Sequence, residues 1–219
     1  MTENTETGSA PAQDPRTRRR NRVMLVALLL LAMLPLIAAV WLYYGEPLDI
    51  AGARTNNGAL LQPPGQLEEL ALLGETGPVV TGESRKWRVL YVAGDGCDDA
   101  CFDRLHLLRQ VQRLLGRESD RVLRLAVFPG GIDDGPRARL QEAFPRMDIV
   151  TGPENLLAEV LRDRELRGGE LTLPAGAPPA SALLTVDPLG NVIFLHLPEQ
   201  IGEPILFDLK RVLRLSNIG

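Results

Sequence analysis

The chain contains two cysteines, and they stand four residues apart in the segment Cys97-Asp98-Asp99-Ala100-Cys101. The segment follows an apolar, β-branched stretch, Trp87–Ala93, and opens a stretch with the apolar spacing of a helix. Thiols at positions i and i+4 of a helix start lie on one face, with Cα atoms about 6.2 Å apart. Such a pair can close a disulfide or hold a soft metal ion. We therefore predict Cys97 and Cys101 as the site residues.

Three roles for this pair remain open from the residues alone. As metal ligands, two thiolates select soft ions such as Cu(I), which is the one candidate cofactor. As a redox pair, Cys97 and Cys101 exchange thiols with a partner, and both would then be catalytic; the helix start favours the thiolate of Cys97. As structural residues, the two cysteines form either a fixed disulfide or two buried thiols, and such a disulfide closes too short a loop to stabilise the fold strongly.

The charged and imidazole side chains near the pair bear on these roles. Four carboxylates would attract a cation but disfavour a thiolate by like-charge repulsion: Asp95, Asp98, Asp99 and Asp103. His106 and His196 are both expected to be ordinary surface or half-buried histidines. His106 points about 140° around the helix from Cys101, and His196 lies on the second arm of the predicted hairpin. Neither histidine is therefore predicted as a third ligand.

A second signal is Val23–Tyr44, which carries no charge over 22 residues. A helix of that length spans about 33 Å, enough for the apolar core of a bilayer. A cleaved signal peptide is the alternative, but its apolar core is shorter, about 7–15 residues. Five arginines and no acid lie between residues 16 and 22, which predicts a cytoplasmic N-terminus and an outer C-terminal part.

The outer part, residues 45–219, is acidic. The whole chain has 28 acids and 24 basic residues, of which three acids and five arginines precede residue 45. The remaining 25 acids and 19 basic residues give a formal charge of −6. This charge disfavours nucleic acid or anionic lipid as a partner of the outer part, and the length suits one domain.

Alternating periodicities follow along residues 66–219. The segment Gln66–Leu73 fits either a short strand or a helix. Strands are predicted over Trp87–Ala93, Arg121–Phe128 and Met147–Thr151, with a hairpin of Ala182–Val186 and Val192–Leu197. Helices are predicted over Asp98–Leu115, Pro136–Phe144, Glu154–Arg167 and Glu203–Leu215. This order predicts an α/β fold, a mixed sheet flanked by helices on both faces, as in a thioredoxin-like domain.

With these elements in place, the chain resembles the Sco family of membrane-anchored copper chaperones of cytochrome oxidase. Three features carry the resemblance: Cys97-x-x-x-Cys101 after a strand, the Asp187-Pro188-x-Gly190 hairpin and the helix Phe207–Leu213. The resemblance implies copper binding and partners among oxidase subunits or other assembly factors. One departure is that Pro179 stands at the counted position of the family's histidine ligand. The chain also lacks a Trp-Cys-x-x-Cys motif, so it resembles a divergent branch.

Together these observations predict four parts. They are a disordered, Arg-rich cytoplasmic arm (1–22), a transmembrane helix (23–44), an extended linker (45–65) and a thioredoxin-like periplasmic domain (66–219). The expected location is the inner membrane, crossed once. The expected function is to assist oxidase assembly through Cu(I) binding or thiol exchange at Cys97 and Cys101, and thiol exchange is the one enzymatic activity indicated. The alternative is a non-catalytic membrane interaction protein that retains the fold and whose cysteines are structural.

Overall fold

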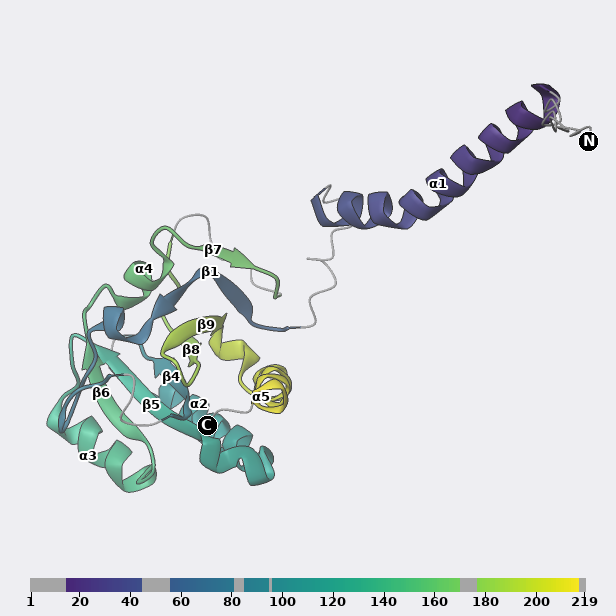
Figure 1. Cartoon of the computed structure of the whole chain (residues 1–219). Coiled ribbons are helices and arrows are strands. Elements are labelled where there is room, and N and C mark those ends of the chain that lie inside the picture. The colour runs from purple at the N-terminus through teal and green to yellow at the C-terminus, as the bar shows by residue number, and fades with distance from the viewer. Residues whose placement is uncertain (1–14, 45–55, 81–84, 95, 170–176, 217–219) are drawn as a thin grey trace, which may run out of the picture. The chain divides into compact units, whose positions relative to one another are not determined.

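A computed structural model of the chain describes residues 15–44, 56–80, 85–94, 96–169 and 177–216. Figure 1 shows the chain, which divides into two compact units, Met1–Ile50 and Ala51–Gly219. The first unit contains α1 (Pro15–Tyr44), whose segment Arg19–Ala38 has the length and apolar composition to cross a membrane. It is the one such helix in the described part of the chain. The predicted disordered arm is wrong for residues 15–22, which are helical, and residues 1–14 lie outside the described residues.

The second unit is built on a mixed sheet, which contains nine strands among the described residues in the order β3-β2-β6-β5-β4-β8-β9-β1-β7. The strands are β1 (Ala59–Gln66), β2 (Leu73–Gly74), β3 (Gly77–Pro78), β4 (Trp87–Val92), β5 (Val122–Pro129), β6 (Asp148–Gly152), β7 (Glu165–Arg167), β8 (Ala182–Val186) and β9 (Asn191–His196). Pairs β4–β5 and β5–β6 are parallel, whereas β4–β8 and β8–β9 are antiparallel. This confirms the predicted fold class, a mixed sheet flanked by helices.

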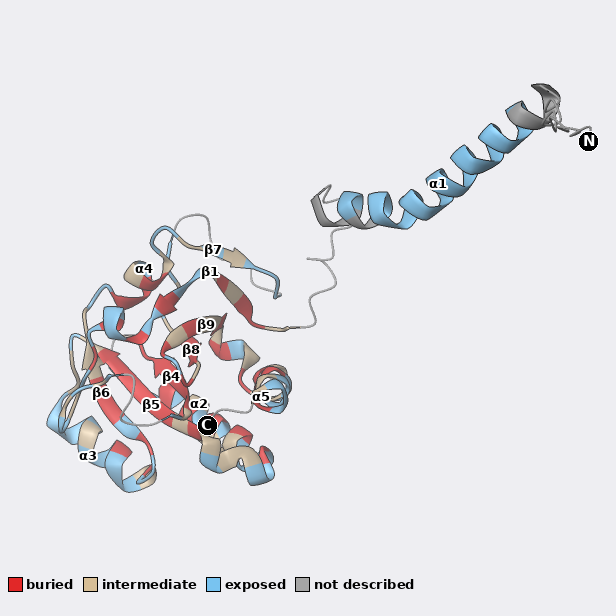
Figure 2. Cartoon of the chain, in the orientation of Figure 1, coloured by how far each residue is buried: buried red, intermediate tan, exposed pale blue. Residues whose placement is uncertain are grey.

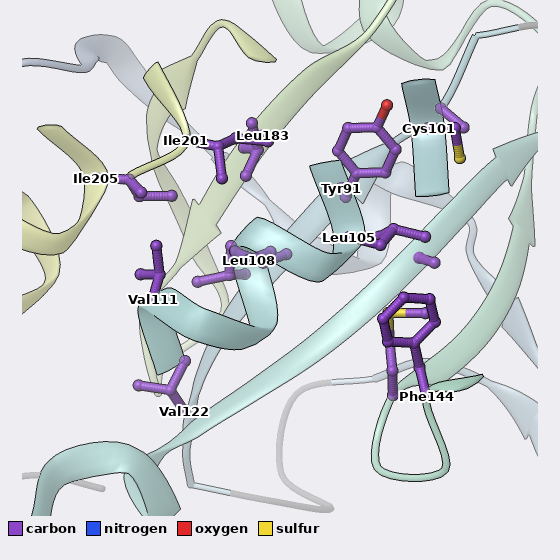
Figure 3. Close-up of a cluster of buried hydrophobic side chains, with 14 of the residues drawn as sticks. Tyr91, Cys101, Leu105, Leu108, Val111, Val122, Phe144, Leu183, Ile201 and Ile205 are labelled. Atoms are coloured by element: carbon purple, nitrogen blue, oxygen red, sulfur yellow. The ribbon is translucent and has the colours of Figure 1, made fainter. Parts of the chain in front are cut away.

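The central strand β4 is buried along all six residues, and Figure 2 shows the same burial over much of β5 and β8. Burial on both faces explains why these strands read as nearly continuous apolar runs. Helices α2 (Asp99–Leu114) and α5 (Glu203–Leu215) contribute to one core cluster, joined by Leu140 of α3 (Asp134–Ala143). Figure 3 shows part of this first cluster, including Leu105, Leu108 and Ile205.

A second cluster includes side chains of a short 3₁₀ helix, Leu67–Leu70, and of α4 (Leu156–Leu161). Side chains of β4 and β5 alternate between the two clusters: Val89 and Tyr91 belong to the first, Leu90 and Val92 to the second. This alternation follows from the two-residue period of a strand. The sheet therefore separates two cores.

Two predicted segments differ from the structure. The expected linker 45–65 ends before residue 59, since β1 begins there and pairs with β9 and β7; residues 45–55 lie outside the described residues. The expected helix Glu154–Arg167 is reduced to α4, followed by Asp163 at φ 55 and by β7. The undecided segment Gln66–Leu73 contains the 3₁₀ helix and the start of β2.

The hairpin between β8 and β9 forms as predicted. The Gly190 N–H donates to the Asp187 carbonyl oxygen at 3.0 Å, which closes the turn. The Asp187 carboxylate also accepts from the backbone N–H of Leu189 and of Asn191. An Asp side chain that accepts from the backbone two residues on is the expected stabiliser of such a turn.

Candidate functional site

The cysteine pair lies where β4 leads into α2. The Asp98 carboxylate caps the helix, accepting from the Cys101 N–H at 2.8 Å, which places Cys101 in the first turn and Cys97 just before the cap. The Cα atoms of the two cysteines are 5.2 Å apart, closer than the helical spacing predicts, because Cys97 lies outside the helix. The structure therefore brings the two predicted site residues together.

The two sulfur atoms form a disulfide, Cys97–Cys101. Cys101 is buried in the first cluster and lies at the same end of it as Tyr91 in Figure 3. Cys97 is half-buried and packs against the same cluster. Of the two residues, Cys97 is therefore the one that a second molecule reaches more easily.

The charges around the disulfide are mixed rather than purely acidic. Three of the four predicted carboxylates, Asp98, Asp99 and Asp103, are exposed, whereas Asp95 lies outside the described residues. Arg139 lies 3.7 Å from the Asp99 carboxylate and stacks over the Phe102 ring. The Tyr91 hydroxyl raises the pKa of Arg104, and the nearby charges of Glu199 and Asp98 add to this shift.

A hollow of about 590 Å³ lies at the carboxyl ends of β4 and β5, and neither cysteine is among its lining residues. Its lining includes Gly94 and Gly96 before Cys97, the Gly130-Gly131 turn, Glu154 and the loop Pro178–Ala180. A Cβ on Gly94 would lie 3.1 Å from the Ala180 carbonyl oxygen, so the two loops pack closely there. Pro179, the position counted back from Asp187, lies in the loop that lines this hollow, and its side chain has no atom that binds copper.

His106 is half-buried, as predicted, and belongs to an aromatic group. Its ring centroid lies 4.8 Å from that of Phe144 and 6.3 Å from that of Phe102. Its Nδ1 lies 3.1 Å from the Arg109 guanidinium. Among the described residues, no group of three or more His, Cys, Asp or Glu side chains is arranged to hold a metal ion.

The expectation for His196 is wrong, because this residue is completely buried. Its Nε2–H donates to the Asp208 carboxylate at 2.9 Å, and the same carboxylate accepts from the backbone N–H groups of Asn57 and Gly58. We call these four residues the His–Asp cluster. The pattern held a signal for it: Asp208 stands on the apolar stripe of α5, between Ile205 and Leu209.

The ionisation of Asp208 reflects its partners. Burial by itself raises the pKa of this carboxyl, but the hydrogen bonds from His196, Gly58 and Asn57 outweigh burial and hold the pKa below its usual range. Asp208 is therefore a carboxylate that accepts from both backbone and side chain. The cluster joins the residues before β1 to β9 and α5, and it includes neither cysteine.

The chain matches the model of a protein family described as the transmembrane-like, thioredoxin-like C-terminal domain, over residues 87–216. Solved structures similar to the chain include copper-bound ScoI of Bradyrhizobium japonicum, with 19% identity over 72% of this chain and 99% of that chain and a TM-score of 0.42. Yeast Sco1 has 15% identity over 75% of this chain and 98% of that chain, with a TM-score of 0.46.

A third similar structure is the thioredoxin domain of a thiol–disulfide oxidoreductase from Bacteroides vulgatus, with 11% identity over 68% of this chain and 98% of that chain and a TM-score of 0.43. No curated protein matches the sequence. Sco proteins and thioredoxin-like oxidoreductases are thus among the structural neighbours, as the resemblance implies. Because the family model covers more than half of the chain, the chain belongs to the family of transmembrane-like, thioredoxin-like C-terminal domains.

Proposed function

We propose that the chain is a membrane-anchored thioredoxin-like protein that assists assembly of a respiratory cytochrome oxidase by exchanging its Cys97–Cys101 disulfide with thiols of a partner. The observation that carries the proposal is the asymmetry of this disulfide at the start of α2, in which Cys97 is half-buried and Cys101 is buried. A fixed bridge needs no such difference in access, whereas exchange needs one sulfur that a partner can attack.

The exchange proceeds through a mixed disulfide. A partner thiolate attacks Cys97 Sγ, forming an intermolecular S–S bond while the Cys97–Cys101 bond breaks and Cys101 leaves as a thiolate. A second thiolate of the partner then attacks the partner's first sulfur, which is bonded to Cys97 Sγ in the mixed disulfide, and Cys97 is released as a thiolate. The partner's two thiols are oxidised to a disulfide, and the Cys97–Cys101 disulfide is reduced to two thiols. The two protons that the partner thiols lose are balanced by the two that the Cys97 and Cys101 thiolates take up. The reverse sequence reduces a partner disulfide.

Trapping of the intermediate tests this proposal. In the full chain purified in detergent micelles, Cys101→Ser leaves the half-buried Cys97 thiol and Cys97→Ser leaves the buried Cys101 thiol. We expect Cys101→Ser to form a mixed disulfide with an aromatic disulfide reagent at least about tenfold faster. Equal rates, or a faster reaction of Cys97→Ser, would contradict the assignment of Cys97 as the attacked sulfur.

Cu(I) binding by the reduced pair is a second candidate, supported by the two sulfurs and the exposed acids Asp98, Asp99 and Asp103. Two thiolates are a donor set that suits Cu(I). Titration of the reduced full chain with Cu(I) against a competing chelator should give one-to-one binding that the Cys97→Ser, Cys101→Ser double variant loses. Equal copper uptake by the two proteins would overturn this candidate.

We also propose that α1 crosses the inner membrane once, with the arginines before it in the cytoplasm and the second unit in the periplasm. The length and composition of Arg19–Ala38 support the crossing, and the arginines support the orientation. Protease added to intact spheroplasts should cleave the second unit and leave an N-terminal epitope protected. Protection of both ends would exclude this orientation.

If both cysteine tests fail, the alternative that remains is a non-catalytic membrane interaction protein whose cysteines are structural.

A further inference from the structure

A buried arginine stands in the middle of the sheet, outside the site described above. Arg124 belongs to β5, between Val122 and Ala126, and these two neighbours on the same face of the strand pack in the first cluster. Its exposed fraction is 4%. A cation in such a position is normally paired, because removing a charge from water is costly.

Arg124 has no such pairing with any residue that the structure describes. Its Nε and Nη1 atoms are buried without a hydrogen-bond partner, and within the described residues no acid forms a salt bridge with it. Burial lowers the pKa of Arg124, and the positive charges of Arg109, Arg113 and Arg146 lower it further. The electrostatic surroundings of this guanidinium are therefore cationic.

These charges line one pocket of about 520 Å³ below the end of α2. The charged side chains in its lining are Lys86, Arg109, Arg113, Asp120, Arg124 and Arg146, so five cations face one carboxylate. We call this site the arginine pocket. Residues 45–219 carry a formal charge of −6, so the excess of basic side chains in the arginine pocket does not follow from the overall composition of this part of the chain.

The neighbouring polar groups leave the cations unneutralised. Arg109 donates through Nη1 to the Ala143 carbonyl oxygen, while its Nε is buried without a partner. Gln112 donates to the carbonyl oxygens of Ser119 and Val122. Asp120 is exposed. Arg109 Nη2 also donates to His106 Nδ1, so the buried guanidinium N–H groups that remain for a ligand are those at Nε and Nη1 of Arg124 and at Nε of Arg109.

We propose that the arginine pocket binds an oxyanion, with a phosphate group as the matching chemistry. Guanidinium groups present several donors in a planar fork that fits phosphate oxygens, and charge-assisted hydrogen bonds of this kind are the strong ones. A phosphate group supplies two negative charges and several acceptors to the unpaired donors. The same group occurs in soluble metabolites and in lipid headgroups, and the test separates these two sources.

Inorganic phosphate is the probe, titrated into the full chain in detergent micelles at constant ionic strength with chloride as the reference anion. We expect calorimetric binding and a phosphate-dependent rise in Tm for the second unit, since a ligand that binds the folded state stabilises it. Arg124→Met, which keeps the length of the side chain and removes the charge, should weaken phosphate binding about tenfold or more.

Two further variants keep the result interpretable. The double variant Arg113→Gln, Arg146→Gln changes exposed side chains only, so it should fold and bind phosphate several-fold more weakly. Arg211→Gln, an exposed arginine of α5, is the matched control and should bind like the wild type. Absence of phosphate binding by the wild type, or equal binding by all variants, would overturn the proposal.

The lipid arm repeats the titration in nanodiscs of phosphatidylcholine alone and of phosphatidylcholine with phosphatidylglycerol. Unchanged phosphate binding in both identifies a soluble phosphate compound as the ligand. A headgroup is identified as the ligand if the wild type loses phosphate binding in the anionic nanodiscs while the double variant Arg113→Gln, Arg146→Gln binds phosphate there as it does in micelles. Either result supports an oxyanion site, and neither depends on the cysteines, so failure here leaves the proposed thiol exchange untouched.

Discussion

Two links in the second unit differ in almost every respect. The Cys97–Cys101 disulfide is covalent, links two residues at a sequence separation of 4 and has one half-buried end. The His–Asp cluster is non-covalent, is buried except for the half-buried Asn57, and joins residues about 150 apart in the sequence through Asp208 and Gly58. The comparison separates two tasks. The stronger bond constrains little of the fold, whereas a set of hydrogen bonds connects three distant segments.

Order-of-magnitude energies support this division. Closing a loop of about five residues with a disulfide stabilises a fold by about 2 kcal/mol at most, because so short a loop costs the unfolded chain little entropy. Each buried donor that loses its acceptor costs about 1–3 kcal/mol, and the Asp208 carboxylate accepts from donors on three residues, Asn57, Gly58 and His196. We infer that the fold depends more on Asp208 than on the disulfide, which leaves the disulfide free to open.

The largest effect is expected from Asp208→Asn. The amide lacks the charge of the carboxylate and replaces one of its two acceptor oxygens with an NH2 group, which cannot accept from the donors on Asn57, Gly58 and His196. We expect a loss of about 3–5 kcal/mol in the free energy of unfolding of the second unit. Chemical unfolding of the full chain in micelles measures it, with the exposed Asp148→Asn as the control. A loss as small as that of the control would break the comparison.

Gly58→Ala should come next. A Cβ on Gly58 would lie 2.4 Å from two atoms of the buried His196 ring, so the ring or the strand must move. Overpacking of this kind costs about 1–3 kcal/mol, and we expect the upper end because the ring is held by Asp208. Gly135→Ala, at a position with nothing within 4 Å of the added Cβ, is the matched control. Equal unfolding midpoints for the two variants would show that the cluster yields easily.

Loss of the disulfide should cost less. The Cys97→Ser, Cys101→Ser double variant is expected to lose about 2 kcal/mol or less of unfolding free energy while losing thiol exchange entirely. Unfolding curves of the double variant and of the oxidised and reduced wild type measure the first effect, and the exchange assay measures the second. A protein that unfolds on reduction would assign the disulfide a structural role.

The pH dependence should be the smallest effect. The pKa of Asp208 is lowered in the folded state, so its contribution to stability is fully present above the unfolded value of about 3.9 and is lost as pH falls through the lower folded value. The wild type should therefore lose more unfolding free energy than Asp208→Asn as the pH falls below about 4. Parallel pH profiles for the two proteins would show that another group is responsible.

Apolar periodicity and turn residues predicted correctly those elements whose boundaries are set by nearby residues. The helix α5 begins and ends at Glu203 and Leu215 as predicted, because its apolar stripe and its turn signals agree. By contrast, β1 contains Pro63-Pro64, which normally indicates a turn, and it pairs across a register shift between Leu60 and Gly65. A strand of this kind depends on its distant partners β9 and β7, which no short window of the sequence contains.

The site shows the same limit. Cys97 and Cys101 could be predicted as a pair because four residues of chain bring them together. His196 and Asp208 meet only when β9, α5 and the residues before β1 assemble, so spacing does not reveal them. Two charged residues in core-facing positions, Asp208 on a helix stripe and Arg124 in a strand, were the available signals. Each belongs to a polar site that periodicity alone reads as part of the apolar core.

The most direct test of the account is the redox equilibrium of the Cys97–Cys101 pair. The full chain is equilibrated in glutathione buffers of stepped potential, and its free thiols are blocked by alkylation and counted by mass. We predict one two-electron transition within the range of exchange-active pairs, about −120 to −270 mV, with the second unit still folded in the reduced state. A disulfide that stays closed below about −300 mV, as structural disulfides do, would contradict the account.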